Sequence, residues 1–190
     1  MGRSLPMTHS TQGSRMDKGI KAAVAAIVFV AGMGVAHAAK PGATPLMYQG
    51  QSQQQAARAL LDTALAQAGK GSWERIGVGR VYYLGGFKEE GQRIFDAILA
   101  GKHEDSDVYR IARVYREAGE WDRARDMFDR YLAANPEEAT GLAEVGAYYL
   151  LEGDRAAAER LFDRSFNAER DDLWATLHAA GAYLGVPPQE

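Results

Sequence analysis

The chain has 190 residues, of which 46% are hydrophobic and 25% are charged, proportions that are ordinary for a globular protein. It has no cysteine, so disulfides, thiol nucleophiles and the lipid-carrying cysteine of a bacterial lipoprotein are not expected. From residue 40 onward, 18 basic and 24 acidic side chains give a formal charge of −6, with the signs interspersed. Nucleic acid is therefore not an expected partner, because binding to phosphates needs clustered Lys and Arg.

Residues 1–38 have the pattern of a secretory signal peptide. A basic start precedes an uncharged run from Ala22 to Ala36, and "AHA" then supplies the small residues of a cleavage site. We expect cleavage after Ala38 and export by the general secretory (Sec) route, which gives a periplasmic or secreted protein of a Gram-negative bacterium. Translation from Met16 would also leave a compact signal. The alternative is an uncleaved anchor, but the run is short for a span of ~20 residues. After cleavage no stable membrane insertion is expected.

Residues 39–52 are predicted to form a flexible lead, because they contain Pro and Gly and have no apolar period. The "PLMYQ" stretch within the lead has the apolar content to fold back into a groove. From Gln53 the pattern is helical nearly to the end, and Gly and Pro separate helices of about 12–14 residues. No segment alternates with the two-residue period of a strand. The sequence therefore predicts an all-α domain over residues 53–186.

Several small and aromatic positions recur along the chain with a step of about 34 residues. The first set is Tyr82, Gly86, Gly91 and Phe95, the second is Tyr115, Gly119, Ala124 and Phe128, the third is Tyr149, Gly153, Ala158 and Phe162, and a further column holds Gly79, Ala112 and Gly146. The small residues would let paired helices approach closely, and the aromatic residues would fill the space beside them. The glycine that follows each tyrosine would end a helix in the left-handed conformation, and Pro136 would stop the helix before it.

This spacing resembles the tetratricopeptide repeat (TPR), which has a period of about 34 residues and a pattern that spaces Trp, Leu, Gly, Tyr, Ala, Phe and Pro over two helices. The resemblance implies a right-handed α-solenoid of about three repeats with a flanking helix at each end. The expected segments are a helix at 53–68, repeats at 72–104, 105–138 and 139–172, and a capping helix at 173–184. The middle repeat matches best. The first departs at Gly91 in the alanine column, and the third has Arg155 where an aromatic residue is usual.

The sequence shows no constellation of catalytic groups. After residue 38 the only histidines are His103 and His178, and no serine lies in a nucleophile elbow. No His, Asp and Glu residues have the spacing of metal ligands. We therefore predict that the protein is not an enzyme and that it uses no metal or cofactor.

The resemblance also implies where a partner would bind, because the first helices of tetratricopeptide arrays line a concave groove. Arg80 and Arg113 occupy the same column of consecutive repeats. Two stacked guanidiniums beside aromatic rings would hold a carboxylate in a bidentate grip. Alternatively, these arginines pair with Glu and Asp of neighbouring helices and keep the face soluble. The candidate binding residues are Trp73, Arg80, Tyr83, Tyr109, Arg113, Arg116 and Leu150.

The expected function is a non-catalytic scaffold or adaptor that binds a protein or peptide partner in the groove. An acidic or carboxyl-terminal segment fits the arginines, and exported arrays of this kind suit envelope, pilus, polysaccharide-export or secretion assembly. The chaperone-type carboxylate clamp needs Lys and Asn, which this face does not offer. The second interpretation is a structural protein that self-associates through the ends of the array.

Overall fold

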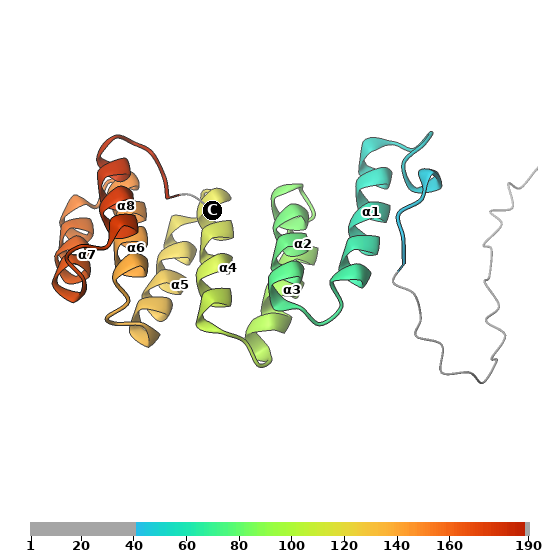
Figure 1. Cartoon of the computed structure of the whole chain (residues 1–190). Helices are drawn as coiled ribbons and strands as arrows, with labels where there is room; N and C mark the ends of the chain where they lie inside the picture. Colours follow the sequence, from blue (N-terminus) through green and yellow to red (C-terminus); the bar gives the residue numbers. More distant parts are fainter. Residues whose placement is uncertain (1–40, 189–190) are drawn as a thin grey trace, which may run out of the picture. The chain divides into compact units, whose positions relative to one another are not determined.

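The computed structural model describes residues 41–188, so the predicted signal peptide and residues 189–190 lie outside the described part. Residues 41–188 contain eight α-helices and no β-strand, which confirms the prediction of an all-α fold for this part of the chain. The helices are α1 (Gln53–Ala68), α2 (Ser72–Leu84), α3 (Lys88–Ala100), α4 (Asp105–Glu117), α5 (Trp121–Ala134), α6 (Ala139–Leu151), α7 (Arg155–Ala168) and α8 (Leu173–Tyr183) (Figure 1).

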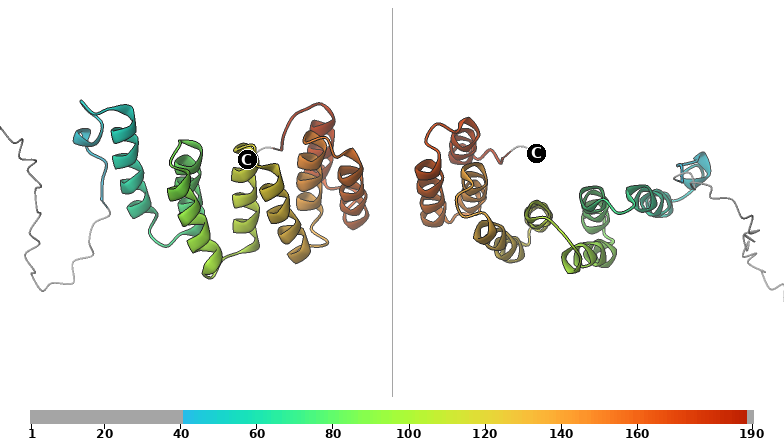
Figure 2. Two further views of the ribbon diagram at one scale, coloured as in Figure 1. Left: turned by 180° about the vertical axis from the view of Figure 1, so that it is seen from behind. Right: turned by 60° about the horizontal axis from the view of Figure 1, so that its bottom comes forward.

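The helices pack as neighbours in chain order. α2 packs on α3, α4 on α5 and α6 on α7, while α1 lies beside α2 and α8 packs against α6. The first two pairs meet where α2 contacts α4, and the next two meet where α5 contacts α6. The helices lie side by side in a row (Figures 1 and 2). We call α2, α4 and α6 the first helices and α3, α5 and α7 the second helices.

Each first helix ends in the same backbone turn. The glycines in the turns, Gly86, Gly119 and Gly153, have φ angles of 91°, 75° and 92°, in the left-handed region that their recurrence in the sequence predicts. The residue after each glycine donates its amide to a carbonyl five residues back at 2.9 Å, in the pairs Phe87 to Tyr82, Glu120 to Tyr115 and Asp154 to Tyr149. This Schellman motif satisfies carbonyls at the helix end and directs the chain into the second helix.

α8 ends in this turn as well, although no second helix follows it in the described residues. Gly185 has a φ of 76°, and the amide of Val186 donates to the carbonyl of Gly181 at 2.8 Å. The next residues are Pro187 and Pro188, which have no amide hydrogen and a fixed φ. α8 is therefore built like a further first helix, after which the chain continues without regular secondary structure.

Small residues allow the paired helices to approach closely. A Cβ added at Gly79 would lie 2.6 Å from Cε1 of Phe95, and one added at Gly91 would lie 2.7 Å from the backbone oxygen of Gly79. In the later pairs the corresponding residues Ala124 and Ala158 are fully buried. These columns of the repeat mark the contacts between the two helices of a pair.

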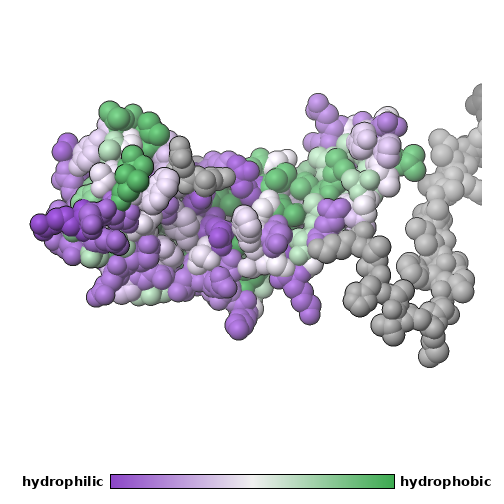
Figure 3. All heavy atoms as spheres, in the orientation of Figure 1, coloured by the Kyte–Doolittle hydropathy of each residue, from purple (hydrophilic) through white to green (hydrophobic). Residues whose placement is uncertain are grey.

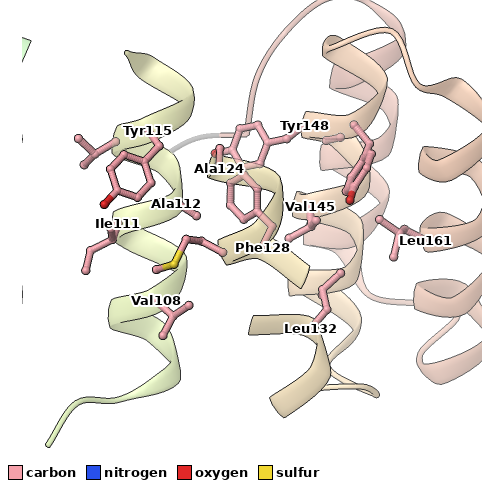
Figure 4. Packing of buried hydrophobic residues seen from close by; sticks show 14 of the residues in the cluster. Val108, Ile111, Ala112, Tyr115, Ala124, Phe128, Leu132, Val145, Tyr148 and Leu161 are labelled. Carbon is pink, nitrogen blue, oxygen red and sulfur yellow. The ribbon is translucent and has the colours of Figure 1, made fainter. Parts of the chain in front are cut away.

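The core runs through the helix pairs and is rich in aromatic rings (Figure 4). Phe128 is fully buried and stacks on Tyr148, with ring centroids 5.2 Å apart and planes at 17°. Phe95 meets Tyr115 edge to face, with centroids 5.9 Å apart. Such pairs contribute ~0.5–1.5 kcal/mol beyond the burial of their area. Because Phe128 belongs to α5 and Tyr148 to α6, the stack fixes one pair against the next.

Part of the predicted lead is ordered against α1. It contains a short 3-10 helix, η1 (Pro45–Met47), whose packing partner is α1. The sulfur of Met47 lies 3.4 Å from the hydroxyl of Thr63, and the side-chain amide of Gln67 donates to the carbonyl of Pro41 at 2.7 Å. The sequence pattern predicts a flexible segment here. The difference arises because the side chain of Met47 packs on α1 and holds the single turn of η1 there.

Candidate functional site

A cleft of about 460 Å³ lies between α2 and α4. Three guanidiniums and one carboxylate line it, and Arg110 also lies 3.7 Å from the buried carboxylate of Asp107, so one positive charge remains in excess to favour an anionic ligand. We call it the arginine cleft. Its lining residues are Trp73, Ile76, Gly77 and Arg80 from α2, and Arg110, Arg113, Val114 and Glu117 from α4.

The helical period explains which side chains share this cleft. On α4, Arg110, Arg113 and Glu117 follow one another by three and four residues and so lie along one face of the helix. The sequence-based prediction followed a neighbouring line on the same helix, through Arg113 and Arg116, and therefore missed Arg110 and Glu117. Arg110 and Glu117 could have been found from the sequence, because they lie three residues before and four residues after Arg113 and so share its helix face.

Arg80 and Glu117 form a bidentate ion pair across the cleft. Nε of Arg80 donates to Oε2 of Glu117 at 2.6 Å, and a second guanidinium nitrogen pairs with Oε1. Both side chains are 42% exposed. An exposed pair of this kind contributes only ~0–1 kcal/mol to stability. A carboxylate from a ligand can therefore replace that of Glu117 at little energetic cost.

Aromatic rings lie beside the other two arginines. The guanidinium carbon of Arg110 is 5.7 Å from the ring centroid of Trp73, and that of Arg113 is 5.8 Å from the ring centroid of Tyr109. Trp73 is 67% exposed, although it is a large apolar residue. Trp and Arg are the residues most enriched among the energetic anchors of protein interfaces. The cleft thus offers a flat apolar surface next to its positive charge.

The cleft continues toward α6. A second hollow of about 200 Å³ is lined by Arg113, Arg116, Glu117, Tyr148, Pro187 and Pro188. Arg113 and Glu117 line both hollows, which are therefore neighbours. Nε of Arg116 lies 3.0 Å from Oε1 of Glu152, and its guanidinium carbon is 4.8 Å from the ring centroid of Tyr148. We call this part of the cleft its α6 end.

Tyr109 also belongs to a polar cluster formed by α4, α6 and α8. Oε1 of Glu144 lies 3.3 Å from Nε2 of the buried His178. Burial raises the pKa of Glu144 above its ordinary value, although the Tyr109 hydroxyl and the charge of His178 oppose the shift. Burial also raises the pKa of Tyr109, and the nearby Tyr148 and Glu144 raise it further. This cluster was not predicted from the sequence, because its members are distant in the chain.

The structure brings four of the seven predicted binding residues to the cleft and its α6 end: Trp73, Arg80, Arg113 and Arg116. Tyr109 contacts the cleft through the ring that Arg113 faces. Tyr83 is only 4% exposed, and its hydroxyl donates to Glu120 at 2.8 Å and accepts from Arg123 at 2.7 Å. Leu150 is half-buried and packs against the core. The structure thus places Tyr83 in the core and Leu150 at its edge instead.

Another hollow, of about 520 Å³, lies elsewhere, between α5 and α7. Two hydrogen bonds connect residues of its lining. Tyr149 donates to Asp129 at 2.9 Å, and Arg164 donates to the carbonyl of Pro136 at 3.0 Å. These bonds join consecutive helix pairs, so we interpret this hollow as a packing junction.

No protein-family model, curated protein or solved structure matches the chain. The resemblance to tetratricopeptide repeats thus rests on the recurrence within the chain. In residues 41–188, no group of three or more His, Asp or Glu side chains is arranged to hold a metal ion. In the same residues, none of the helices combines the length and apolar character needed to cross a bilayer.

Proposed function

We propose that the chain is a tetratricopeptide-like α-solenoid that acts as a non-catalytic adaptor and holds an acidic segment of a partner protein in the arginine cleft. The observation that carries this proposal is the lining of that cleft, which combines Arg80, Arg110 and Arg113 with an exposed Trp73. Guanidiniums bind carboxylates in a planar, bidentate geometry, and the indole supplies apolar contact area.

Two features support the solenoid. The helix pairs recur with the step of the sequence pattern, and each first helix ends in the same glycine turn. A stack of such pairs presents its first helices along one side, as the contact between α2 and α4 illustrates. The signal-like pattern of residues 1–38 supports a periplasmic location. An envelope, pilus, polysaccharide-export or secretion assembly is the setting that we propose.

Affinity capture from a periplasmic extract tests the role of the cleft. The wild-type protein is compared with an Arg80→Ala/Arg113→Ala variant. The matched control, Arg93→Ala/Arg125→Ala, removes the same charge from positions outside the cleft on α3 and α5. We expect one partner to be retained by the wild type and the control but lost by the cleft variant. Capture should also weaken as salt screens the contact. An identical set of proteins on all three baits would exclude the arginine cleft as the binding site.

Self-association through the end of the array is a second candidate, favoured by the surface of α8. Leu173 and Leu184 are 63% and 82% exposed, and Trp174 and Leu177 are also exposed. Hydrophobic surface gathers over this end of the described residues (Figure 3). Contiguous apolar patches are typical of protein contacts. Light scattering over a wide range of concentration tests this candidate, because a strict monomer at high concentration excludes it.

A further inference from the structure

The segment after α8 lies at the α6 end of the arginine cleft. From the turn at Gly185 the chain runs back toward α4 (Figure 1). Pro187 and Pro188 line the same hollow as Arg116 and Tyr148, and Pro188 is buried. Pro188 is buried because its side chain packs against the surface of other helices. Here that surface belongs to the first helices.

The turn at the end of α8 directs the chain back toward α4. The amide of Val186 is held by the carbonyl of Gly181 at 2.8 Å. A Cβ at Gly181 would lie 3.1 Å from the carbonyl oxygen of Val186, so the glycine leaves room for the returning backbone. The glycine turn thus fixes the direction in which Pro187 leaves α8.

The chemistry of the segment matches that of the cleft. Consecutive prolines favour an extended backbone that loses little entropy on binding, and such segments dock on aromatic surfaces. Tyr148 and the guanidinium of Arg116 provide a surface of this kind beside Pro187 and Pro188. Gln189 and Glu190 follow in the sequence and include a carboxylate, and Arg113 lines both the α6 end and the rest of the cleft.

We propose that residues 186–190 are a ligand of the arginine cleft in cis. Pro187 and Pro188 line the α6 end beside Arg116 and Tyr148, and Glu190, two residues further along the sequence, offers a carboxylate that the arginines can bind. A partner then has to displace this segment, and it does so with the same chemistry: an extended stretch with prolines followed by an acidic residue. The statement about the partner rests on the proposed function, whereas occupancy by the chain's own segment does not.

Cross-linking tests the occupancy directly, because the chain has no cysteine of its own. In a Glu117→Cys/Gln189→Cys variant, a short bismaleimide should link the two thiols within one chain. The control Arg130→Cys/Gln189→Cys keeps one thiol and moves the other to an exposed position on α5. It should not cross-link. Equal yields in both variants, or a covalent dimer in place of the intramolecular product, would overturn occupancy in cis.

Peptide binding tests the chemistry. A fluorescent "GVPPQE" peptide is titrated into the wild type and into a Pro187→Gly/Pro188→Gly variant, whose own segment is released. The variant should bind about tenfold more tightly, as expected if the segment fills the site about nine-tenths of the time. A peptide ending in Lys in place of Glu should not bind, and Arg113→Glu should abolish binding. Equal affinities overturn the occupancy, and no binding to either protein overturns the assigned ligand class.

The two proposals fail in different ways. Suppose that partner capture depends on Arg80 and Arg113, but that neither the cross-link nor peptide binding is observed. The adaptor function is then supported and the proposal of a ligand in cis is rejected. If the intramolecular cross-link forms, but partner capture is unchanged in the Arg80→Ala/Arg113→Ala variant, the ligand in cis is supported and binding of the partner in the cleft is rejected.

Discussion

Arg80 and Glu117 lie 37 residues apart in the sequence and meet across the arginine cleft, with Nε 2.6 Å from Oε2. α2 contributes the cation and α4 the anion, so the pair connects two consecutive helix pairs. It is also a guanidinium–carboxylate contact at the place where we propose that an acidic partner binds. The partner's carboxylate would compete with Glu117 for the same donors.

The Glu117→Gln variant should therefore bind acidic peptides more tightly. Removal of the competing carboxylate corresponds to ~0.5–1 kcal/mol, or about two- to fivefold in the dissociation constant. The free energy of unfolding should change by no more than ~0.5 kcal/mol, because both side chains are partly exposed. Fluorescence titration and urea unfolding measure the two quantities. Glu89→Gln is the control, since it makes the same charge change at an exposed position on α3. A similar gain in affinity in the control would show that only the net charge matters.

Two glycines of α2 should respond in opposite directions to the same substitution. A Cβ at Gly79 would lie 2.6 Å from Cε1 of Phe95, whereas a Cβ at Gly77 meets nothing within 4 Å. Gly79→Ala should lower the free energy of unfolding by ~1–3 kcal/mol through overpacking. Gly77→Ala should raise it by ~0.5–1 kcal/mol, because alanine restricts the unfolded chain. Urea unfolding measures both, and changes of the same sign would contradict the packing that we describe.

Asp172 should stabilise the protein in a way that acid removes. Its carboxylate accepts a hydrogen bond from Thr140 at 2.6 Å and caps α8 through the amides of Trp174 and Ala175. These bonds, that of Thr140 first, lower its pKa below the ordinary 3.8. The folded state then binds the proton less tightly than the unfolded state, so stability rises with pH through this window.

Asp172→Ala should cost ~1–2 kcal/mol at neutral pH, as the loss of a helix cap does. The difference between the variant and the wild type should shrink as the pH falls below 3.8 and through the folded pKa. Unfolding free energies at several pH values provide the measurement. A difference that does not depend on pH would mean that the charge of Asp172 plays no part.

Glu144 should show the opposite dependence on pH. Burial raises its pKa above 4.5, so the folded state binds this proton more tightly than the unfolded state does. The contribution of Glu144 to stability is then largest at low pH and falls as the pH rises from 4.5 through the folded pKa. Glu144→Gln should remove that decline, which pH-dependent urea unfolding would reveal. His178→Gln serves as the companion variant, because it removes the partner 3.3 Å away and leaves the carboxylate in place.

The helices could be predicted from the sequence because their signals are local. A glycine in the left-handed conformation ends each first helix, and apolar residues with helical spacing fill the helices between these turns. The turn after α8 carries the same signal in Gly185, but the step from Gly153 to Gly185 is shorter than the earlier steps and the columns no longer align. The crossing of Pro188 to α4 was not predictable, since it depends on where α4 and α8 lie in space.

Side-chain partners were only partly predictable. The tyrosine column is evident from the recurrence, but its hydrogen bonds are not. Tyr82 donates to Asp62 at 2.6 Å and Tyr149 donates to Asp129 at 2.9 Å, in both cases to a residue 20 positions earlier in the chain. Tyr115 donates instead to Gln92, 23 positions earlier, so in all three cases the bond connects a first helix with the helix before its pair. In the cleft, the sequence predicts the arginine column correctly, whereas Tyr83 lies in the core instead, where its ring contacts those of Phe95 and Tyr115.

The return of the chain from α8 to α4 has a thermodynamic consequence. α8 packs against α6, and the segment that follows it adds a contact with the arginine cleft. If a partner removes that contact, α8 opens more readily, and its backbone amides exchange faster with deuterium. Linkage then requires the reciprocal effect: the state in which α8 is open binds the partner more tightly, by the same factor by which the partner raises the opening constant of α8. Amide exchange in α8 would therefore report binding at a cleft formed by two other helices.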